Sequence, residues 1–199
     1  MNFIVNKLYG NNFIFVELVK RDFKNKYKRT ALGVFWSILS PLLMLCIMAA
    51  IFGHFFSRDI QHYISYLFSG LVIFNYYAES TNEGMNALMS NAKIFSKINV
   101  PKYLFLFSKN VSALINFGII LVIYLCFIAA DGVIFTFNFL LLIYPIICLV
   151  FINLGMGLIL SALYIFFRDI QYLYSLFTRV IMYGSAIFYS IDILPHHLQ

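Results

Sequence analysis

Four long stretches of this chain contain no Asp, Glu, Lys or Arg, and they constrain the fold more than any other feature. They cover residues 30–57, 60–78, 110–130 and 132–167. Each is long enough for a membrane-spanning helix, which needs about 20 mostly apolar residues. A fifth stretch, residues 170–191, is interrupted only by Arg179. The sequence therefore predicts an all-α, polytopic integral membrane protein.

The predicted architecture is a single transmembrane domain with about five transmembrane helices. No linker or repeat divides residues 1–199, and 62% of them are hydrophobic while only 11% are charged. In soluble domains about 45–50% of the residues are hydrophobic and about 25% are charged. This chain therefore has too few charged side chains to cover a water-facing surface. The expected spans are about 32–56, 62–80, 104–129, 138–166 and 171–191.

The distribution of positive charge predicts the orientation. The chain has 14 Lys and Arg residues and a net charge of +6. If the N-terminus is inside, Arg58 is the one basic residue that falls on the external side, as the positive-inside rule requires. We therefore expect a multi-pass protein of the cytoplasmic (inner) membrane with a cytoplasmic N-terminus. Because topology accounts for the positive charge, no nucleic-acid partner is expected.

Two cytoplasmic segments have amphipathic patterns. In residues 1–29, apolar side chains alternate with charged ones, which predicts a helix on the membrane surface; a disordered basic lead-in is the alternative. Residues 83–102 repeat apolar side chains at three- and four-residue spacing, which predicts a short coupling helix. That helix packs on its own protein or the bilayer, or in a groove of a cytoplasmic partner. Its candidate partner-binding residues are Met85, Leu88, Met89, Phe95, Lys97 and Pro101.

Polar and aromatic side chains near the span ends are candidates for an interface or a transport path. Arg179 lies nearly two turns inside the last span, so it snorkels, pairs or lines a polar path. Glu79 and Glu83, spaced i,i+4, are either solvated or hold a proton or cation. The many tyrosines form interfacial belts or offer flat faces to sugar rings. The interface and channel candidates are Tyr27, Arg29, Trp36, Arg168, Asp169, Arg179, Tyr183 and Tyr189.

The sequence contains none of the common enzyme motifs. It has no phosphate-binding loop, no zinc-protease helix and no nucleophile elbow. We therefore expect no catalytic residue, no metal and no cofactor. The alternative function is a membrane-embedded transferase acting on lipid-linked sugars. Its candidate residues are two carboxylates and the four histidines expected on the external side: Asp59, Asp192, His54, His62, His196 and His197.

Three separated motifs resemble a known family. The sequence YKRTALGVFWSILSP at 27–41 is similar to the start of the ABC-2 type permeases that export cell-surface polysaccharides. NAKIFSKINVPK at 91–102 resembles the segment that follows the second span in that family. FRDIQ at 167–171 resembles the family's turn between spans four and five, and GSAIFY at 184–189 with the following Leu-Pro resembles the end of span five. The chain is identified as a member of this family.

The resemblance implies both partners and function. It implies a permease homodimer with two copies of a separate ABC ATPase, which binds the ATP, so the chain itself needs no cofactor. The coupling segment would receive the motion of the ATPases, and spans one and five would line the channel. The implied function is export of lipid-linked O-antigen, capsular polysaccharide or teichoic acid. Family members also continue to a sixth span, which is absent from these 199 residues, so truncation at the C-terminus is expected.

Overall fold

All regular structure in the described part of the chain is helical, which confirms the predicted all-α class. The computed structural model describes residues 2–28, 33–56, 62–95, 97, 100–133, 136–185 and 187–189. The α-helices are α1 Asn2–Tyr27, α2 Trp36–Phe56, α3 Tyr63–Ser90, α4 Ala92–Phe95, α5 Tyr103–Ala130, α6 Ile143–Phe166 and α7 Ile170–Gly184. Short 3-10 helices, Gly33–Phe35 and Phe137–Leu142, precede α2 and α6.

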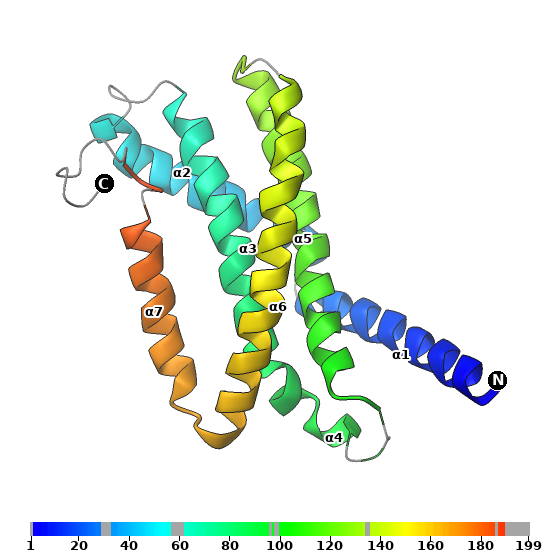
Figure 1. The fold of residues 1–199 in the computed structure, drawn as a ribbon. Helices are drawn as coiled ribbons and strands as arrows, with labels where there is room; N and C mark the ends of the chain where they lie inside the picture. The colour runs from blue at the N-terminus through cyan, green and yellow to red at the C-terminus, as the bar shows by residue number, and fades with distance from the viewer. Residues whose placement is uncertain are drawn as a thin grey trace.

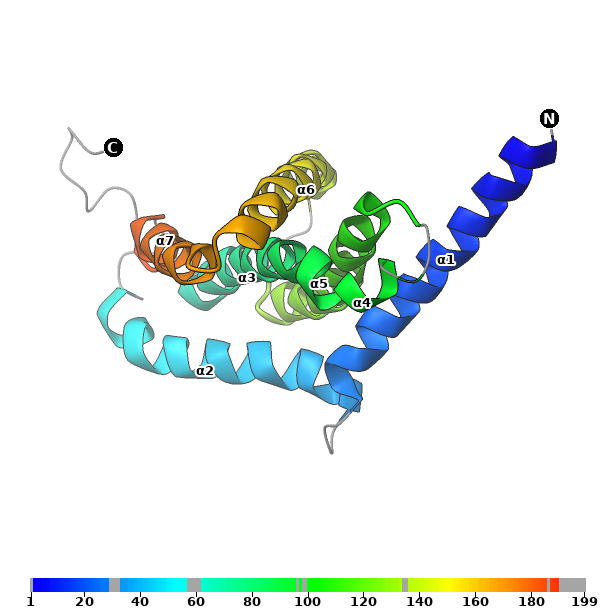
Figure 2. The same ribbon diagram turned by 90° about the horizontal axis from the view of Figure 1, so that it is seen from below.

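The helices are arranged around α3. It packs against α2, α5, α6 and α7, and the last three run alongside it in Figure 1. Figure 2 shows that α2 crosses one side of α3 and α5 while α6 lies on the other side. From the start of α2, α1 leaves the bundle at an angle, and the N-terminus lies away from the other helices. The polar residues described below lie where α1 meets this bundle.

The helices cover the five stretches predicted as spans, with differences at their ends. Among the described residues, Tyr103–Ala130 and Phe139–Phe166 are each long and apolar enough to cross a bilayer by themselves. The α-helical part of the second begins only at Ile143, after a 3-10 turn. Pro145 lies in its first turn, where the missing N–H of proline costs no intrahelical hydrogen bond. The last helix ends at Gly184, earlier than the predicted residue 191.

The helix that contains the second predicted span does not end near residue 80. α3 is 28 residues long and runs to Ser90, so residues 83–90 of the predicted coupling segment are its last two turns. Only Ala92–Phe95 of that segment form a separate helix, α4. Polar side chains along this part of α3 bond to carbonyls of their own helix. Asn82 Nδ2 donates to Ala78 O at 2.7 Å, and Asn86 Nδ2 donates to Asn82 O at 2.9 Å. These local bonds let polar residues extend the helix without external partners.

Aromatic contacts make up much of the apolar core between α3 and α5. Tyr76 and Phe117 stack with ring centroids 4.6 Å apart, and Phe68 meets Tyr124 edge-on at 5.4 Å. Such pairs add about 0.5–1.5 kcal/mol beyond the burial of their area. The core therefore holds α5 firmly along the middle of α3.

The backbones of α3 and α6 approach each other closely where the two helices cross. A Cβ added at Gly84 would lie 3.0 Å from Gly157 Cα, and one added at Gly157 would lie 3.5 Å from Gly84 Cα. Small residues at a helix crossing allow this close backbone contact, which replaces the hydrophobic driving force that lipid removes. Gly155, two residues before Gly157 on α6, has nothing within 4 Å of an added Cβ.

The segment after α7 folds back onto the beginning of α3. Tyr63 Oη donates a hydrogen bond to Phe188 O at 2.9 Å, across 125 residues of sequence. Phe188 is buried in the apolar core, and its ring stacks on Tyr183 at 5.7 Å. Residues 187–189 are thus fastened to the end of α3 opposite the charged residues.

Candidate functional site

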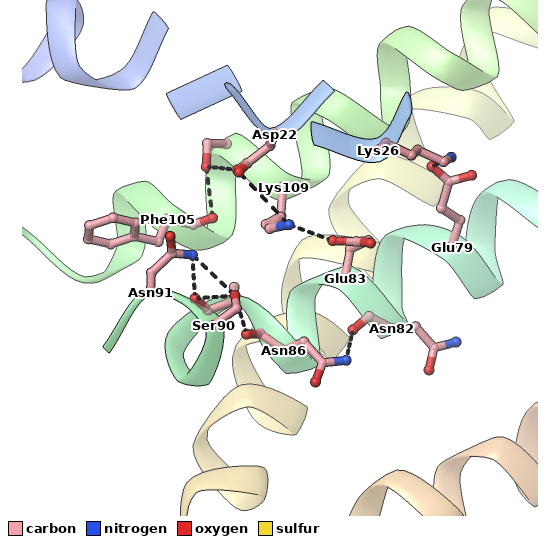
Figure 3. A network of polar contacts seen from close by, with 12 residues as sticks. Asp22, Lys26, Glu79, Asn82, Glu83, Asn86, Ser90, Asn91, Phe105 and Lys109 are labelled. Atoms are coloured by element: carbon pink, nitrogen blue, oxygen red, sulfur yellow. Dashed lines mark hydrogen bonds and ion pairs between the residues drawn. The ribbon is translucent and has the colours of Figure 1, made fainter. Parts of the chain in front are cut away.

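A network of charged side chains joins α1, α3 and α5 (Figure 3). The Asp22 side chain of α1 is only 4% exposed. Its carboxylate accepts hydrogen bonds from Arg21 Nη2 at 2.7 Å and Ser108 Oγ at 3.1 Å. Lys109 of α5 lies between two carboxylates, with Nζ 2.7 Å from Glu83 Oε2 of α3 and 3.9 Å from Asp22 Oδ1. The network therefore fastens α1 to two helices of the bundle.

A second ion pair lies next to this network. Lys26 Nζ, near the end of α1, is 2.6 Å from Glu79 Oε1 of α3. The other Glu79 oxygen accepts a hydrogen bond from Asn116 Nδ2 of α5 at 3.0 Å. Both ion pairs line one cavity of about 240 Å³. Glu79 and Glu83 are thus paired with lysines, as charges within apolar helices require, and are not simply solvated as one sequence interpretation held.

A larger polar groove opens beside the Lys26–Glu79 pair, with a volume of about 740 Å³. One wall belongs to the first turns of α2, including Trp36, and the other to α3 and α5. Trp36 is 39% exposed and is the one tryptophan of the chain. We call this space the polar groove; the polar side chains that line it are Lys26, Ser37, Ser40, Asn75, Glu79, Asn82, Glu83 and Asn116.

Asn75 distinguishes the polar groove from ordinary helix packing. Its side chain is exposed, and it makes no hydrogen bond with any residue that the structure describes. An amide left without a partner in hydrocarbon costs several kcal/mol. By contrast, a cavity of about 420 Å³ between α3, α5 and α6 has an almost wholly apolar lining. A polar occupant of the groove could bond to this amide, whereas an apolar one could not.

Further polar groups lie between α3, α5 and α6. Asn110 Nδ2 of α5 donates to Ser80 Oγ of α3 at 2.8 Å, and both residues are buried. Asn153 of α6 is also buried, and neither its amide nor Tyr76 Oη has a hydrogen-bond partner among the described residues. These groups specify which faces of the three helices meet, because any other arrangement would place them in lipid.

Met85, one of the predicted partner-binding residues, lies in the protein interior. It is completely buried and packs with Leu160 of α6 and Tyr174 of α7, so its place on a partner-binding surface is corrected to a core position. Leu88 and Met89 are partly buried near the end of α3. The apolar spacing of this stretch therefore reflects packing on its own protein and not binding in a groove of a cytoplasmic partner.

The rest of the predicted coupling segment follows α3. Phe95 is the last residue of α4, and its side chain lies outside the described part of the structure. Lys97 is exposed, and the partly buried Pro101 comes two residues before α5. The exposed Lys93 on α4 adds a second charge to this end of the molecule.

The interface and channel candidates fall in separate places. Trp36 lines the polar groove, where α2 begins beside α1. Arg168 and Asp169 are exposed in the turn between α6 and α7. Arg179 is exposed on α7 and makes no ion pair with the residues that the structure describes. The structure therefore does not bring these residues together within one chain.

Four aromatic or basic candidates complete the predicted set. Tyr183 is exposed near the end of α7, and its carbonyl accepts a hydrogen bond from Tyr189 Oη at 3.4 Å. Tyr27 is the last residue of α1, with a side chain outside the described part, and Arg29 lies wholly outside the described residues.

The transferase alternative gains no clustered site. His62 Nδ1 lies 3.0 Å from Asp131 Oδ2, but no group of three His, Cys, Asp or Glu side chains among the described residues is placed to hold a metal ion. For the remaining candidates of that alternative, the structure describes no side chain: Asp59, Asp192, His54, His196 and His197.

The His62–Asp131 contact predicts a pH dependence of stability. A hydrogen bond from Ser65, followed by the contact with His62, lowers the pKa of Asp131 below its ordinary 3.8. A carboxyl with a lowered pKa in the folded state contributes stability above pH 3.8 and loses it as the pH falls through the folded-state value. The Asp131→Asn variant should melt below the parent at pH 7, and the difference should shrink below pH 3.8. A difference that does not vary between pH 7 and pH 3 would contradict this assignment.

Sequence reasoning named Glu79, Glu83 and Trp36 but missed the other residues of the network and the groove. Asp22 lies in the predicted surface helix and Lys109 near the start of the third predicted span, where a charge at the membrane interface is expected. Asn75 and Asn116 lie in stretches selected for lacking charge, so they attracted no attention. The sequence did contain a signal for these residues. Placing an amide or a carboxylate inside an apolar span costs free energy, so such residues tend to be functional.

Comparisons with known proteins agree with this architecture. The ABC-2 type transporter model matches residues 14–199. The O-antigen export system permease protein RfbA of Klebsiella pneumoniae is 28% identical over 94% of this chain and 74% of its own length. RfbA of Myxococcus xanthus is 24% identical over 95% of this chain and 73% of its own length. The polysialic acid transport protein KpsM of Escherichia coli is 22% identical over 89% of this chain and 70% of its own length. With nearly all of its described helices inside the matched region, the chain belongs to the ABC-2 type transporter family.

Proposed function

We propose that this chain is the permease subunit of an ATP-driven exporter of cell-surface polysaccharide. The similarity to relatives named as permeases for O-antigen export and for polysialic acid transport carries this proposal. The polar groove among apolar helices supports it, since a glycan needs polar partners on its way through a membrane. Membership of the family supports a role as the membrane subunit of a transporter, with no catalytic activity of its own. The substrate class is lipid-linked O-antigen, capsular polysaccharide or teichoic acid.

The proposed assembly contains two copies of this permease and two copies of a separate ABC ATPase. ATP binds to the ATPase, and the permease holds no cofactor of its own. The absence of a phosphate-binding loop from these 199 residues is compatible with this division of labour. The complex belongs to the cytoplasmic (inner) membrane, with α1 and α4 on the cytoplasmic side. Tyr27 and Arg29 belong to that cytoplasmic interface, and the exposed Arg179 and Tyr183 of α7 face the transport path.

In the proposed mechanism, the ATPase contacts α4 and the segment up to Pro101. The start of α5 follows this segment directly, and the ion pairs of Lys109 and Lys26 connect α5, α3 and α1. A push on α4 would therefore move these helices together and change the space between them and α2. Such a unit with two positions is what alternating access requires.

The Phe95→Asp substitution tests the coupling, introduced at the chromosomal gene in the cells that make this protein. Burying a phenylalanine is worth roughly 1.5–3 kcal/mol, and a charge at an apolar contact adds a further cost. We expect loss of co-purification with the ATPase and loss of surface polysaccharide. The matched control is Phe137→Asp, because Phe137 is exposed at the other end of the bundle. This variant should still co-purify with the ATPase and still produce surface polysaccharide. Normal binding and export in Phe95→Asp would refute the proposed contact.

Impermeant thiol labelling tests the orientation after the three native cysteines are replaced. Lys93 on α4 and Thr136 before α6 are both exposed, at opposite ends of α5. Thr136→Cys should react in intact cells, and Lys93→Cys should react only after the membrane is permeabilised. The reverse pattern would invert the proposed topology.

A further inference from the structure

We propose that the polar groove between α2 and α3 binds neutral sugar residues of the transported glycan. This inference rests on the proposed export function and names the part of the substrate that the groove recognises. Its volume of about 740 Å³ lies within the ~300–1,000 Å³ of small-molecule sites.

The lining has the chemistry that sugar rings need. Trp36 offers a large flat aromatic surface at the edge of the groove, suited to the C–H face of a ring. Asn75 supplies an amide with two donors and an acceptor that takes two hydrogen bonds. Asn82, whose Nδ2 already donates to Ala78 O at 2.7 Å, adds the rest of its amide. Ser40 adds an exposed hydroxyl. Hydroxyl groups of a sugar can satisfy all of these at once.

The charges of the groove disfavour an anionic occupant. Among its described lining residues, Lys26 is the one cation, and it is already bonded to Glu79 at 2.6 Å. The Glu83 carboxylate is likewise paired, with Lys109 at 2.7 Å, and Lys109 is not among the lining residues. A phosphate group would therefore find each of these charges already paired, whereas a sugar hydroxyl can still donate to the carboxylate oxygens.

The free amide of Asn75 identifies the point of recognition. Its side chain is exposed to the groove, with no hydrogen bond to the described residues. A lipid tail in the groove would leave this amide and the serine hydroxyl unsatisfied. A lipid tail has a better fit in the apolar cavity between α3, α5 and α6. The groove therefore favours a polyhydroxyl ligand.

Photo-crosslinking in the cells that make this protein tests the inference with their own glycan. Benzoylphenylalanine is introduced in place of Asn75 or Ser40 in the groove. Asn86, on the same helix but outside the groove lining, is the matched control, and Tyr183 represents α7. After irradiation and denaturing purification, the adducts are tested by carbohydrate staining and by mass for phospholipid.

We expect carbohydrate-positive adducts at Asn75 and Ser40 and none at Asn86. Carbohydrate adducts at Tyr183 alone would overturn the groove inference and leave the proposed function standing. Phospholipid adducts at Asn75 without carbohydrate would also overturn it. Carbohydrate adducts at none of these positions would count against the groove inference and the export function together.

Conservative substitutions provide a second readout that does not depend on a bulky probe. Removing a group that hydrogen-bonds substrate leaves its partner unpaired, so Asn75→Leu should lower export about tenfold. Asn75→Gln, which keeps the amide, and Asn86→Leu should remain within about twofold of the parent. Equal export by Asn75→Leu and the parent, at equal membrane levels, would overturn the inference.

Discussion

Replacing Gly84 with leucine is expected to cause the largest loss of stability of any single substitution considered for this protein. The added Cβ would lie 3.0 Å from Gly157 Cα, which is backbone and has no rotamer by which to move away. Overpacking a core typically costs about 1–3 kcal/mol, and a leucine at a backbone crossing belongs at the upper end. At about 2–4 °C per kcal/mol, the melting midpoint in detergent should fall by about 6–12 °C.

The control for this experiment is Gly155→Leu on the partner helix α6. An added Cβ at Gly155 has nothing within 4 Å, so the substitution should change the midpoint by less than about 2 °C. Gly84→Ala should give an intermediate value, because it adds the Cβ alone. Equal midpoints for Gly84→Leu and Gly155→Leu would show that the two helices do not cross at this point.

Removing the Asp22 carboxylate is expected to have the second largest effect, through release of α1 from the bundle. Breaking a buried ion pair costs about 3–5 kcal/mol. The Lys109 side chain retains 17% exposure, so it can be partly rehydrated and we expect about 2 kcal/mol for Asp22→Ala. The midpoint should fall by about 4–8 °C, with a parallel increase in proteolysis of the N-terminal segment.

Glu17→Ala is the matched control on the same helix. Glu17 also pairs with a lysine, Lys20 at 3.0 Å, but their side chains are 52% and 68% exposed. Exposed pairs contribute only about 0–1 kcal/mol. Similar losses in Glu17→Ala and Asp22→Ala would mean that α1 is not held by its buried carboxylate.

The sequence was sufficient to predict the class and family of this chain because both depend on long, simple patterns. Charge-free stretches determine where apolar helices form, and α2, α5 and α6 lie within or close to them. The end of α3 was not predictable in this way. Its polar residues suggested a cytoplasmic break, but their side chains bond to carbonyls one turn back, so the helix continues to Ser90.

The candidate site was less predictable, because it forms between residues far apart in the sequence. The contact of Lys26 with Glu79 spans 53 positions, and that of Asp22 with Ser108 spans 86. Periodicity within one helix carries no information about such pairs. It also misassigned Met85, since apolar spacing looks the same whether the partner is another protein or, as here, α6 and α7.

The hydrogen bond between Tyr63 and the carbonyl of Phe188 has a consequence for biosynthesis. The two residues are separated by 125 positions, and ribosomes add about 5–20 residues per second. The Tyr63 hydroxyl must therefore wait about 6–25 s after it is made before its native acceptor exists. During that interval the N-terminal end of α3 depends on lipid headgroups, water or the insertion machinery to satisfy its phenol, so a residue made 125 positions later completes the polar contacts of this helix.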